Sequence, residues 1–157
     1  ADGAALLPLL MAIRATSFRR AESMGDEPFD IVVLDADERH IRRKRITLSH
    51  GEDILIDFEK PVRLEQGDRL VLEDGRVAKV VAAEEDLMEV TARDARHLVE
   101  LAWHIGNRHL PAQIGDSRIL LRRDRIIRAM LEQLGAEVRD VTEPFTPEHG
   151  AYHSHDH

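Results

Sequence analysis

Hydrophobic and polar residues alternate along residues 29–82 in a way that predicts short β-strands. Apolar or alternating runs occupy 29–34, 45–48, 53–58, 69–72 and 77–82. Residues that favour turns separate these runs, including Ser-His-Gly at 49–51, Glu-Gln-Gly-Asp at 65–68 and Glu-Asp-Gly-Arg at 73–76. Because no helical pattern of useful length interrupts the runs, we expect this half of the chain to be all-β.

From residue 87 to residue 141 the pattern mixes strand and helix periods. Strands are expected at 87–91, 112–115, 117–121 and 137–141. A helix is expected to begin at Thr91, with Asp94 three residues later as in a capping box, and to end at Gly106. A second helix is expected between Asp124 as its cap and Gly135 as its end. The resulting order, strand-helix-strand-strand-helix-strand, is that of the ferredoxin-like unit.

The two patterns together predict an α+β protein with an N-terminal all-β domain and a ferredoxin-like βαββαβ domain. We expect a disordered extension, the all-β domain, the ferredoxin-like domain and a flexible His-containing tail at 1–10, 11–83, 84–144 and 145–157. The tail is placed after Pro144 because Pro144 and Pro147 mark the exit from the last strand. The acidic run 84–86 is expected to be the hinge between the domains.

Composition limits the classes of function. The 157 residues include no Cys, which excludes disulfide scaffolds, thiol catalysis and cysteine-ligated metal sites. Apolar runs stay far below the ~20 residues of a membrane helix, so no membrane partner is expected. With 22 Lys and Arg against 30 Asp and Glu, the net charge of −8 argues against a nucleic-acid partner. The unusual feature of the composition is its nine His residues.

The C-terminal end of the chain is the first candidate for chemistry. Four of the nine His lie in the last nine residues: His149, His153, His155 and His157. Imidazole suits nickel, copper and zinc, and alternate His residues can fold back onto one ion. Because a mobile segment loses chain entropy on binding, such a tail suits capture and release of a metal. An inert, solvated tail is the alternative.

The second candidate is the segment 103–113, in which His104 lies in the last turn of the first helix and His109 follows the turn. An exposed residue at the end of a rigid helix is a favourable position for a metal ligand. The alternative for His104 is an interaction with the helix dipole. The alternative for Gly106 and Asn107 is that these residues only end the helix.

Gly106-Asn107-Arg108-His109, followed by Pro111 and Gln113, resembles the signature of the urease accessory protein UreE family. Further segments recur in the family's order: Arg42-Arg43-Lys44-Arg45, Gly67-Asp68, Met130-Leu131-Glu132-Gln133-Leu134-Gly135 and Pro144-Phe145. The resemblance extends over residues 11–157. It implies an N-terminal domain similar to a peptide-binding chaperone module, a ferredoxin-like metal-binding domain and a homodimer.

The function that this resemblance implies is that of a cytoplasmic nickel metallochaperone for urease, without catalysis of its own. Ni(II) would be bound at the dimer interface by His109 of both chains, and a capture arm would consist of His153, His155 and His157. His104 and His149 are secondary candidates, and Zn(II) or Cu(II) are expected to substitute for nickel. The implied partners are the urease apoprotein and its accessory complex, including the urease GTPase.

One departure from the family concerns residues 122–125, where some members carry additional His. Here these positions are Arg122, Arg123, Asp124 and Arg125, and arginine stays protonated and does not ligate metal. We therefore expect no secondary metal site at this place.

Two further groups have alternative interpretations. The run Arg42, Arg43, Lys44, Arg45 is either a docking patch for a partner or a solvated strand edge. His97 shares a helical stripe with Leu101 and is expected to pack in the core or at an interface.

Two rival functions differ in class from a metallochaperone. A metallohydrolase needs three rigid ligands and a placed base, which His104, His109 and nearby carboxylates do not supply. A metal-independent adaptor that binds peptide or urease-assembly partners through the β domain is the stronger alternative, and it predicts that replacing His109 leaves urease activation intact. Because histidine ligates only when neutral, nickel uptake should weaken below about pH 6–6.5.

Overall fold

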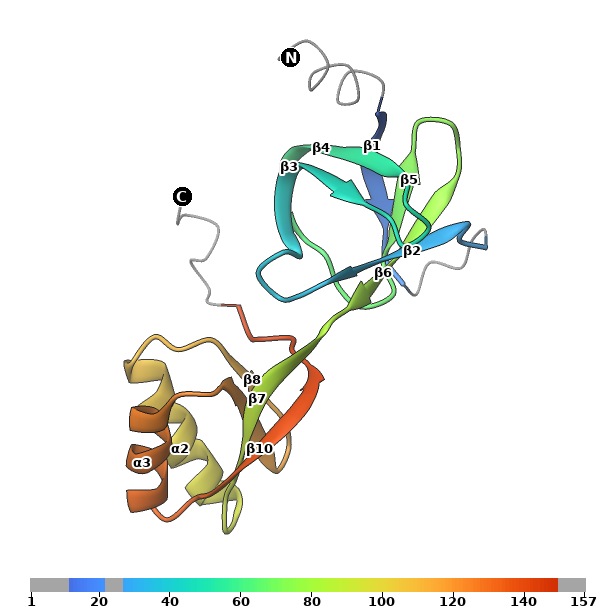
Figure 1. Ribbon diagram of the computed structural model, residues 1–157. Helices are drawn as coiled ribbons and strands as arrows, with labels where there is room; N and C mark the ends of the chain where they lie inside the picture. The colour runs from blue at the N-terminus through green and yellow to red at the C-terminus, as the bar shows by residue number, and fades with distance from the viewer. Residues whose placement is uncertain (1–11, 22–26, 150–157) are drawn as a thin grey trace, which may run out of the picture. The chain divides into compact units, whose positions relative to one another are not determined.

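A computed structural model describes residues 12–21 and 27–149, and the chain divides into two compact units between Ala83 and Glu84 (Figure 1). The expected hinge at 84–86 is wrong. These residues are the first of strand β7 (Glu84–Thr91), where Glu84 pairs with Pro144 of β10 (Glu137–Pro144). The acidic side chains of the run hid a strand whose buried positions begin only at Leu87.

The N-terminal unit is a six-stranded sheet in the order β2-β6-β5-β1-β4-β3 (Figure 1). Its strands are β1 (Ile13–Arg19), β2 (Asp30–Leu34), β3 (His40–Thr47), β4 (Asp53–Arg63), β5 (Arg69–Leu72) and β6 (Val77–Ala82). The sequence pattern does not predict β1, because the pairing of β1 with β5 shifts register between Ala15 and Ser17. Such a bulge interrupts the period of two by which a strand is recognised.

Alternating buried residues build the core of this unit. The buried residues of β4, β5 and β6 include Ile54, Ile56, Leu70, Leu72, Ala78 and Val80. Strand β3 begins five residues earlier than its predicted start at residue 45, because its buried positions are only Ile41 and Ile46. Between them lie four consecutive exposed cationic residues, which conceal the strand in the sequence.

A buried carboxylate holds the turn before β5. Asp68 is fully buried and accepts hydrogen bonds from Arg20 Nη1 at 2.7 Å, from the Glu65 backbone N–H at 2.8 Å and from the Ala21 backbone N–H at 3.2 Å. Gly67 beside it has a φ of +87°, and a Cβ added there would lie 2.9 Å from Cβ of Ala21. The pair Gly67-Asp68 therefore ties the chain that leaves β1 to this turn.

The C-terminal unit has the predicted ferredoxin-like order. Its elements are β7, α2 (Ala95–Asn107), β8 (Ala112–Ile114), β9 (Arg118–Arg122), α3 (Arg125–Gln133) and β10. The four strands form an antiparallel sheet in the order β10-β7-β9-β8, and Figure 1 shows both helices on the same side of it. The core between sheet and helices includes Met88, Val90, Leu101, Ile105, Ile119, Leu121 and Leu131. The α+β fold class is confirmed.

The helix ends follow the sequence signals only in part. Asp124 caps α3 by accepting the Ile127 N–H at 2.9 Å, and Gly135 follows the helix with a φ of +89°, both as predicted. The predicted start of α2 at Thr91 is wrong, because Asp94 is the cap and accepts the His97 N–H at 2.8 Å. Gly106 does not end α2 either, since the helix continues to Asn107.

Residues 145–149 differ from the flexible tail predicted to begin at 145. Phe145 is fully buried, and the Arg122 guanidinium lies 5.2 Å from its ring centroid. Glu148 then donates its backbone N–H to the Ala112 carbonyl at 2.7 Å, so the segment runs along the outer side of β8. The buried side chain of Phe145, which lies between Pro144 and Pro147, keeps this segment on the unit. Residues 150–157 and the predicted extension 1–10 lie outside the described residues.

Candidate metal centre

The turn that follows α2 presents His109 at the surface. The Arg108 N–H bonds to the Ile105 carbonyl at 3.1 Å, and the His109 N–H bonds to the Gly106 carbonyl at 3.1 Å. His109 has a φ of +55° and is the only non-glycine residue with a positive φ in the described part of the chain. Helices commonly end with a left-handed residue, which is usually glycine. The backbone therefore turns sharply at His109, whose side chain is exposed.

His104 lies one turn before the end of α2 and is half-buried. Its ring meets the edge of the Trp103 ring at a centroid distance of 5.1 Å and an interplanar angle of 84°. As the basic residue of the last turn it is also placed to interact with the helix dipole. Its position is thus compatible with both sequence-based interpretations.

Large apolar side chains are exposed on the same helix. Val99 and Trp103 are one helical turn apart and expose 67% and 64% of their surface. Contiguous exposed apolar side chains on a protein surface often mark a site of interaction with another molecule. The stripe leads along α2 toward the turn that carries His109.

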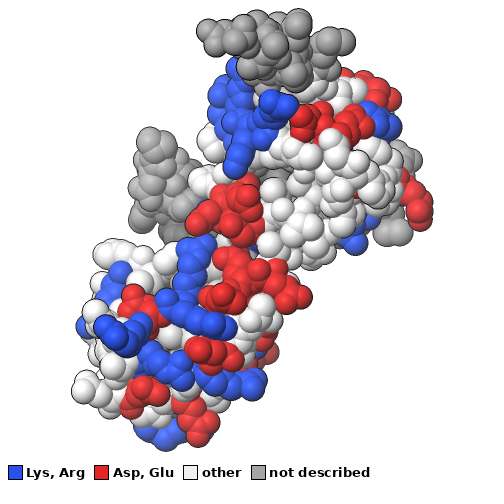
Figure 2. Space-filling model, viewed as in Figure 1, with Lys and Arg blue, Asp and Glu red and all other residues white. Residues whose placement is uncertain are grey.

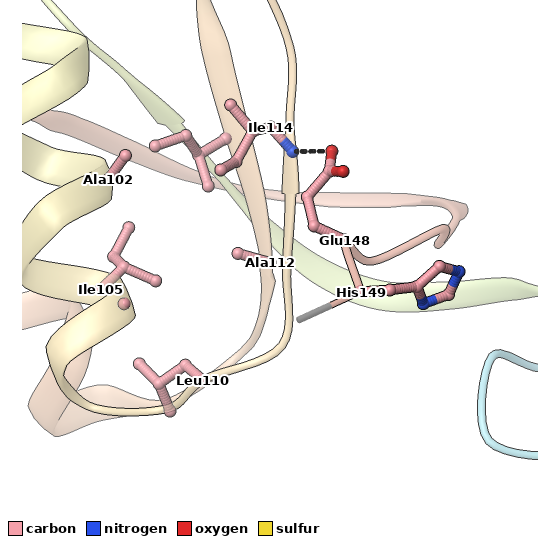
Figure 3. Close-up of a pocket in the computed structure, with 9 residues that line it drawn as sticks. Ala102, Ile105, Leu110, Ala112, Ile114, Glu148 and His149 are labelled. Carbon is pink, nitrogen blue, oxygen red and sulfur yellow. Dashed lines mark hydrogen bonds between the residues drawn. The ribbon is translucent and has the colours of Figure 1, made fainter. Parts of the chain in front are cut away.

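A small apolar pocket lies beside that turn and is the feature that sequence reasoning missed. It is lined by Ala102, Ile105, Gly106, Leu110, Ala112, Ile114, Ile119, Glu148 and His149 and has a volume of about 190 Å³. Figure 3 shows side chains of α2 facing those of β8 across the opening, with Glu148 and His149 on the β8 side. The structure therefore brings His149 to the pocket that Gly106 and Leu110 also line. In the sequence, Gly106 precedes His109 and Leu110 follows it.

The burial of Phe145 is what places His149 there. From Phe145 the chain passes the edge strand β8, where Thr146 N–H bonds to Gln113 Oε1 at 2.8 Å and the Ile114 N–H reaches Glu148 Oε1 at 3.3 Å. The pair Pro144-Phe145 could have predicted this path. It does so only if Phe145 is interpreted as a buried residue that holds the segment against the unit. The other predicted ligands, His153, His155 and His157, lie outside the described residues.

His97 is a packing residue, as the sequence pattern predicts. It is buried, its Nδ1 accepts the Arg93 backbone N–H at 3.0 Å, and its Nε2 donates to the Leu134 carbonyl at 2.8 Å. Both ring nitrogens are engaged, so neither is available to a metal without loss of a hydrogen bond.

The basic run 42–45 lies on β3, which is an edge strand of the N-terminal sheet. Arg45 forms an ion pair with Asp53, and Arg43 Nε lies 4.0 Å from Asp57. Arg45 and Thr47 together lower the pKa of the Asp53 carboxyl, with the Thr47 hydrogen bond as the larger cause. Figure 2 shows Lys and Arg gathered on this side of the unit. Arg42 and Lys44 are exposed on the same strand.

Over the C-terminal unit, acidic and basic side chains alternate (Figure 2). Glu89 accepts hydrogen bonds from Arg139 Nε and Arg118 Nη1, both at 2.6 Å, and Arg118 also pairs with both oxygens of Glu143 at 2.8 Å. Arg139 first and Arg118 second lower the pKa of the Glu89 carboxyl. Glu143 and Glu89 in turn raise the pKa of Arg118. These charges compensate one another and stabilise the sheet.

Residues 122–125, at which the sequence predicts no secondary metal site, have structural roles. Arg123 donates hydrogen bonds to the carbonyls of Leu87 and Val141, both at 3.0 Å. Arg122 lies over the Phe145 ring, and Asp124 caps α3.

In residues 12–21 and 27–149, no three His, Asp or Glu side chains come together as a metal cluster. Neither helix in that part of the chain has the length and hydropathy needed to span a membrane.

Comparison with known protein families identifies both units. Residues 14–83 match the model of the UreE urease accessory protein N-terminal domain, and residues 85–157 match that of the C-terminal domain. The chain belongs to the UreE family of urease accessory proteins. The resemblance based on the segment 106–113 is confirmed.

Individual relatives agree with this assignment. The chain is 53% identical over 143 residues to the urease accessory protein UreE of Agrobacterium fabrum, which covers 91% of this chain and 89% of that protein. It is 55% identical over 147 residues to UreE of Brucella anthropi, with 91% and 86% covered, and 57% identical over 140 residues to UreE 1 of Brucella suis, with 88% and 86% covered. These proteins are named as accessory proteins of urease, not as enzymes.

Proposed function

We propose that this UreE family member binds Ni(II) at a homodimer interface and delivers it to apo-urease during assembly of the urease metal centre. It acts as a carrier in the cytoplasm and catalyses no reaction itself. Nickel is the cargo of the protein, and Zn(II) or Cu(II) substitute for it at the same ligands because imidazole binds all three ions.

The observation that carries the proposal is the position of His109. The side chain is exposed, it follows a rigid helix, and its backbone is held in a left-handed conformation that most residues avoid. A residue kept at a mildly strained backbone position is a reason to look for a function of its side chain. Metal ligation is the function that an exposed imidazole serves best here.

A dimer follows from the number of ligands. One imidazole per chain is too few for a stable site, but a two-fold axis supplies a second His109 at the same point. The exposed Val99 and Trp103 on α2 support this arrangement, because they offer the apolar contact that two such units would bury.

The remaining ligands come from the C-terminal residues. His153, His155 and His157 act as a capture arm, with His149 and His104 as secondary ligands. The secondary ligand His149, which precedes the arm in the sequence, lies at a pocket beside the His109 turn, and this supports an arm that starts close to the site. A site shared between an interface and an arm is readily taken apart, as delivery requires.

Transfer of nickel requires contact with the urease apoprotein and its accessory complex, including the urease GTPase. We assign this contact to the N-terminal unit, with Arg42, Arg43, Lys44 and Arg45 as part of the surface. The exposed charges of this strand support the assignment.

The test is nickel titration calorimetry on the full chain, with the dimer mass measured in parallel. The wild type is expected to bind about one tight ion per dimer. His109→Asn should lose this ion and remain dimeric, since asparagine tolerates the left-handed conformation. His50→Asn removes an exposed histidine of the other unit and serves as the matched control.

Equal nickel binding by the wild type and His109→Asn would overturn the interface site. If His109→Asn then also supported urease activation in cells, the metal-independent adaptor would be the better account.

A further inference from the structure

The pocket beside the His109 turn is apolar in its walls and open to one side. Ala102 and Ile105 come from α2, Leu110 from the turn, and Ala112 and Ile114 from β8, as Figure 3 shows. Its volume of about 190 Å³ is below that of usual small-molecule sites, which begin at about 300 Å³. An apolar cavity of about 150 Å³ is enough to hold one benzene ring. The pocket thus has the size and lining for one aromatic side chain.

The path of the chain favours one occupant. His149 lines the pocket, and the residues that follow it, 150–157, include only Ala151 and Tyr152 as apolar side chains. Three residues of extended chain reach about 10 Å, so the ring of Tyr152 is within range of a pocket that begins at His149. The carboxylate of Glu148 at the rim is an acceptor for the hydroxyl that a docked tyrosine must satisfy.

We propose that Tyr152 docks its ring in this pocket and anchors the histidine-containing end of the chain beside the turn that carries His109. The docking itself needs no metal, and only its use in nickel capture rests on the proposed function. Because His153 follows Tyr152 directly, docking would shorten the free chain between the turn and the first ligand of the arm. Less chain entropy is then lost when that ligand binds.

The test is fluorine NMR on the full, metal-free chain labelled with 3-fluorotyrosine. Tyr152 is the only tyrosine, so one resonance is expected, shifted and broadened relative to the urea-unfolded chain. Gly106→Leu should return this resonance to the unfolded position, because Gly106 lines the pocket and a Cβ added there meets no atom within 4 Å. Ala129→Leu adds the same side chain at an exposed position of α3 and should leave the resonance shifted.

A second measurement does not depend on the folding of a pocket variant. Tyr152→Ser should move the methyl resonances of Ile105 and Ile114, which line the pocket, and leave that of Ile126 on α3 in place. Tyr152→Phe keeps the ring and should leave the Ile105 and Ile114 resonances close to those of the wild type.

The proposal is overturned if the wild-type fluorotyrosine resonance lies at the unfolded position, or if Gly106→Leu leaves it shifted. A shift that disappears on dilution would also overturn it, because the pocket would then be filled from a second copy. A nickel titration that fails while the fluorine resonance behaves as expected would contradict the proposed function and not the docking.

Discussion

The Nε2 of His97 lies 2.8 Å from the carbonyl oxygen of Leu134, and this hydrogen bond joins the first turn of α2 to the residue after α3. The Nδ1 of the same ring accepts the Arg93 N–H. One imidazole therefore satisfies a backbone donor before α2 and a backbone acceptor after α3.

Replacing His97 by leucine should destabilise the C-terminal unit by about 2–3 kcal/mol, because it leaves the Arg93 N–H and the Leu134 carbonyl without their partner. Both described helices belong to this unit, so the helical circular dichroism signal during urea unfolding reports its stability. His104→Leu, in the same helix but half-buried, should cost less than about 1 kcal/mol. Equal losses for the two variants would contradict the role assigned to His97.

At His109 the backbone and the proposed ligand function have opposite requirements. His109→Gly should raise the stability of the unit by up to about 1 kcal/mol, because glycine adopts the left-handed conformation freely. His109→Val should lower it by about 1–2 kcal/mol, because a β-branched residue is least suited to a positive φ. The same unfolding measurement checks both, and an unchanged stability in both variants would contradict the strain.

Two glycines of the N-terminal unit provide a matched pair. Gly67 and Gly75 have φ values of +87° and +91°, but only at Gly67 does an added Cβ meet another atom, at 2.9 Å from Ala21 Cβ. Gly75→Ala should cost about 1–2 kcal/mol from the backbone alone. Gly67→Ala should cost at least about 1 kcal/mol more, because the contact with Ala21 forces a shift.

Hydrogen exchange of the β5 amides measures this difference within the unit. Equal protection in the two alanine variants would mean that the chain at Ala21 yields without cost.

Acid should weaken the C-terminal unit through Glu89. Its pKa lies below the ordinary value of 4.5 because Arg139 and Arg118 donate to it, so the folded state binds the proton less readily than the unfolded chain. The resulting stabilisation is complete above about pH 4.5 and is lost as the pH falls through the lower folded-state pKa.

Glu89→Gln should therefore lower stability at neutral pH and flatten its decline below about pH 4.5. Urea unfolding at several pH values measures both effects, with Glu137→Gln, an exposed residue of β10, as the control. A variant that keeps the wild-type slope below that pH would refute the contribution of Glu89.

The features that the sequence predicts well are those fixed by local chemistry. The order of strands and helices in the C-terminal unit, the cap at Asp124 and the end at Gly135 all depend on neighbours within one turn. The errors have non-local causes. Thr91 and Asp94 both resemble helix caps, and the pairing of β7 up to Thr91 decides between them.

The same distinction applies to the candidate site. The motif 106–109 identifies the turn, but its left-handed residue is His109 and not the glycine that a helix end usually uses. The pocket depends on Phe145 being buried and on β8 being the edge strand, and neither is visible in a local pattern.

The segment after Phe145 also restricts how this protein associates. The carbonyl of Ala112 and the N–H of Ile114 point outward from edge strand β8, and Glu148 engages both. A second chain cannot extend the sheet at this edge without first displacing that segment. Association of two copies on this side of the unit is thereby directed to side-chain surfaces, which can separate and re-form without any exchange of strands.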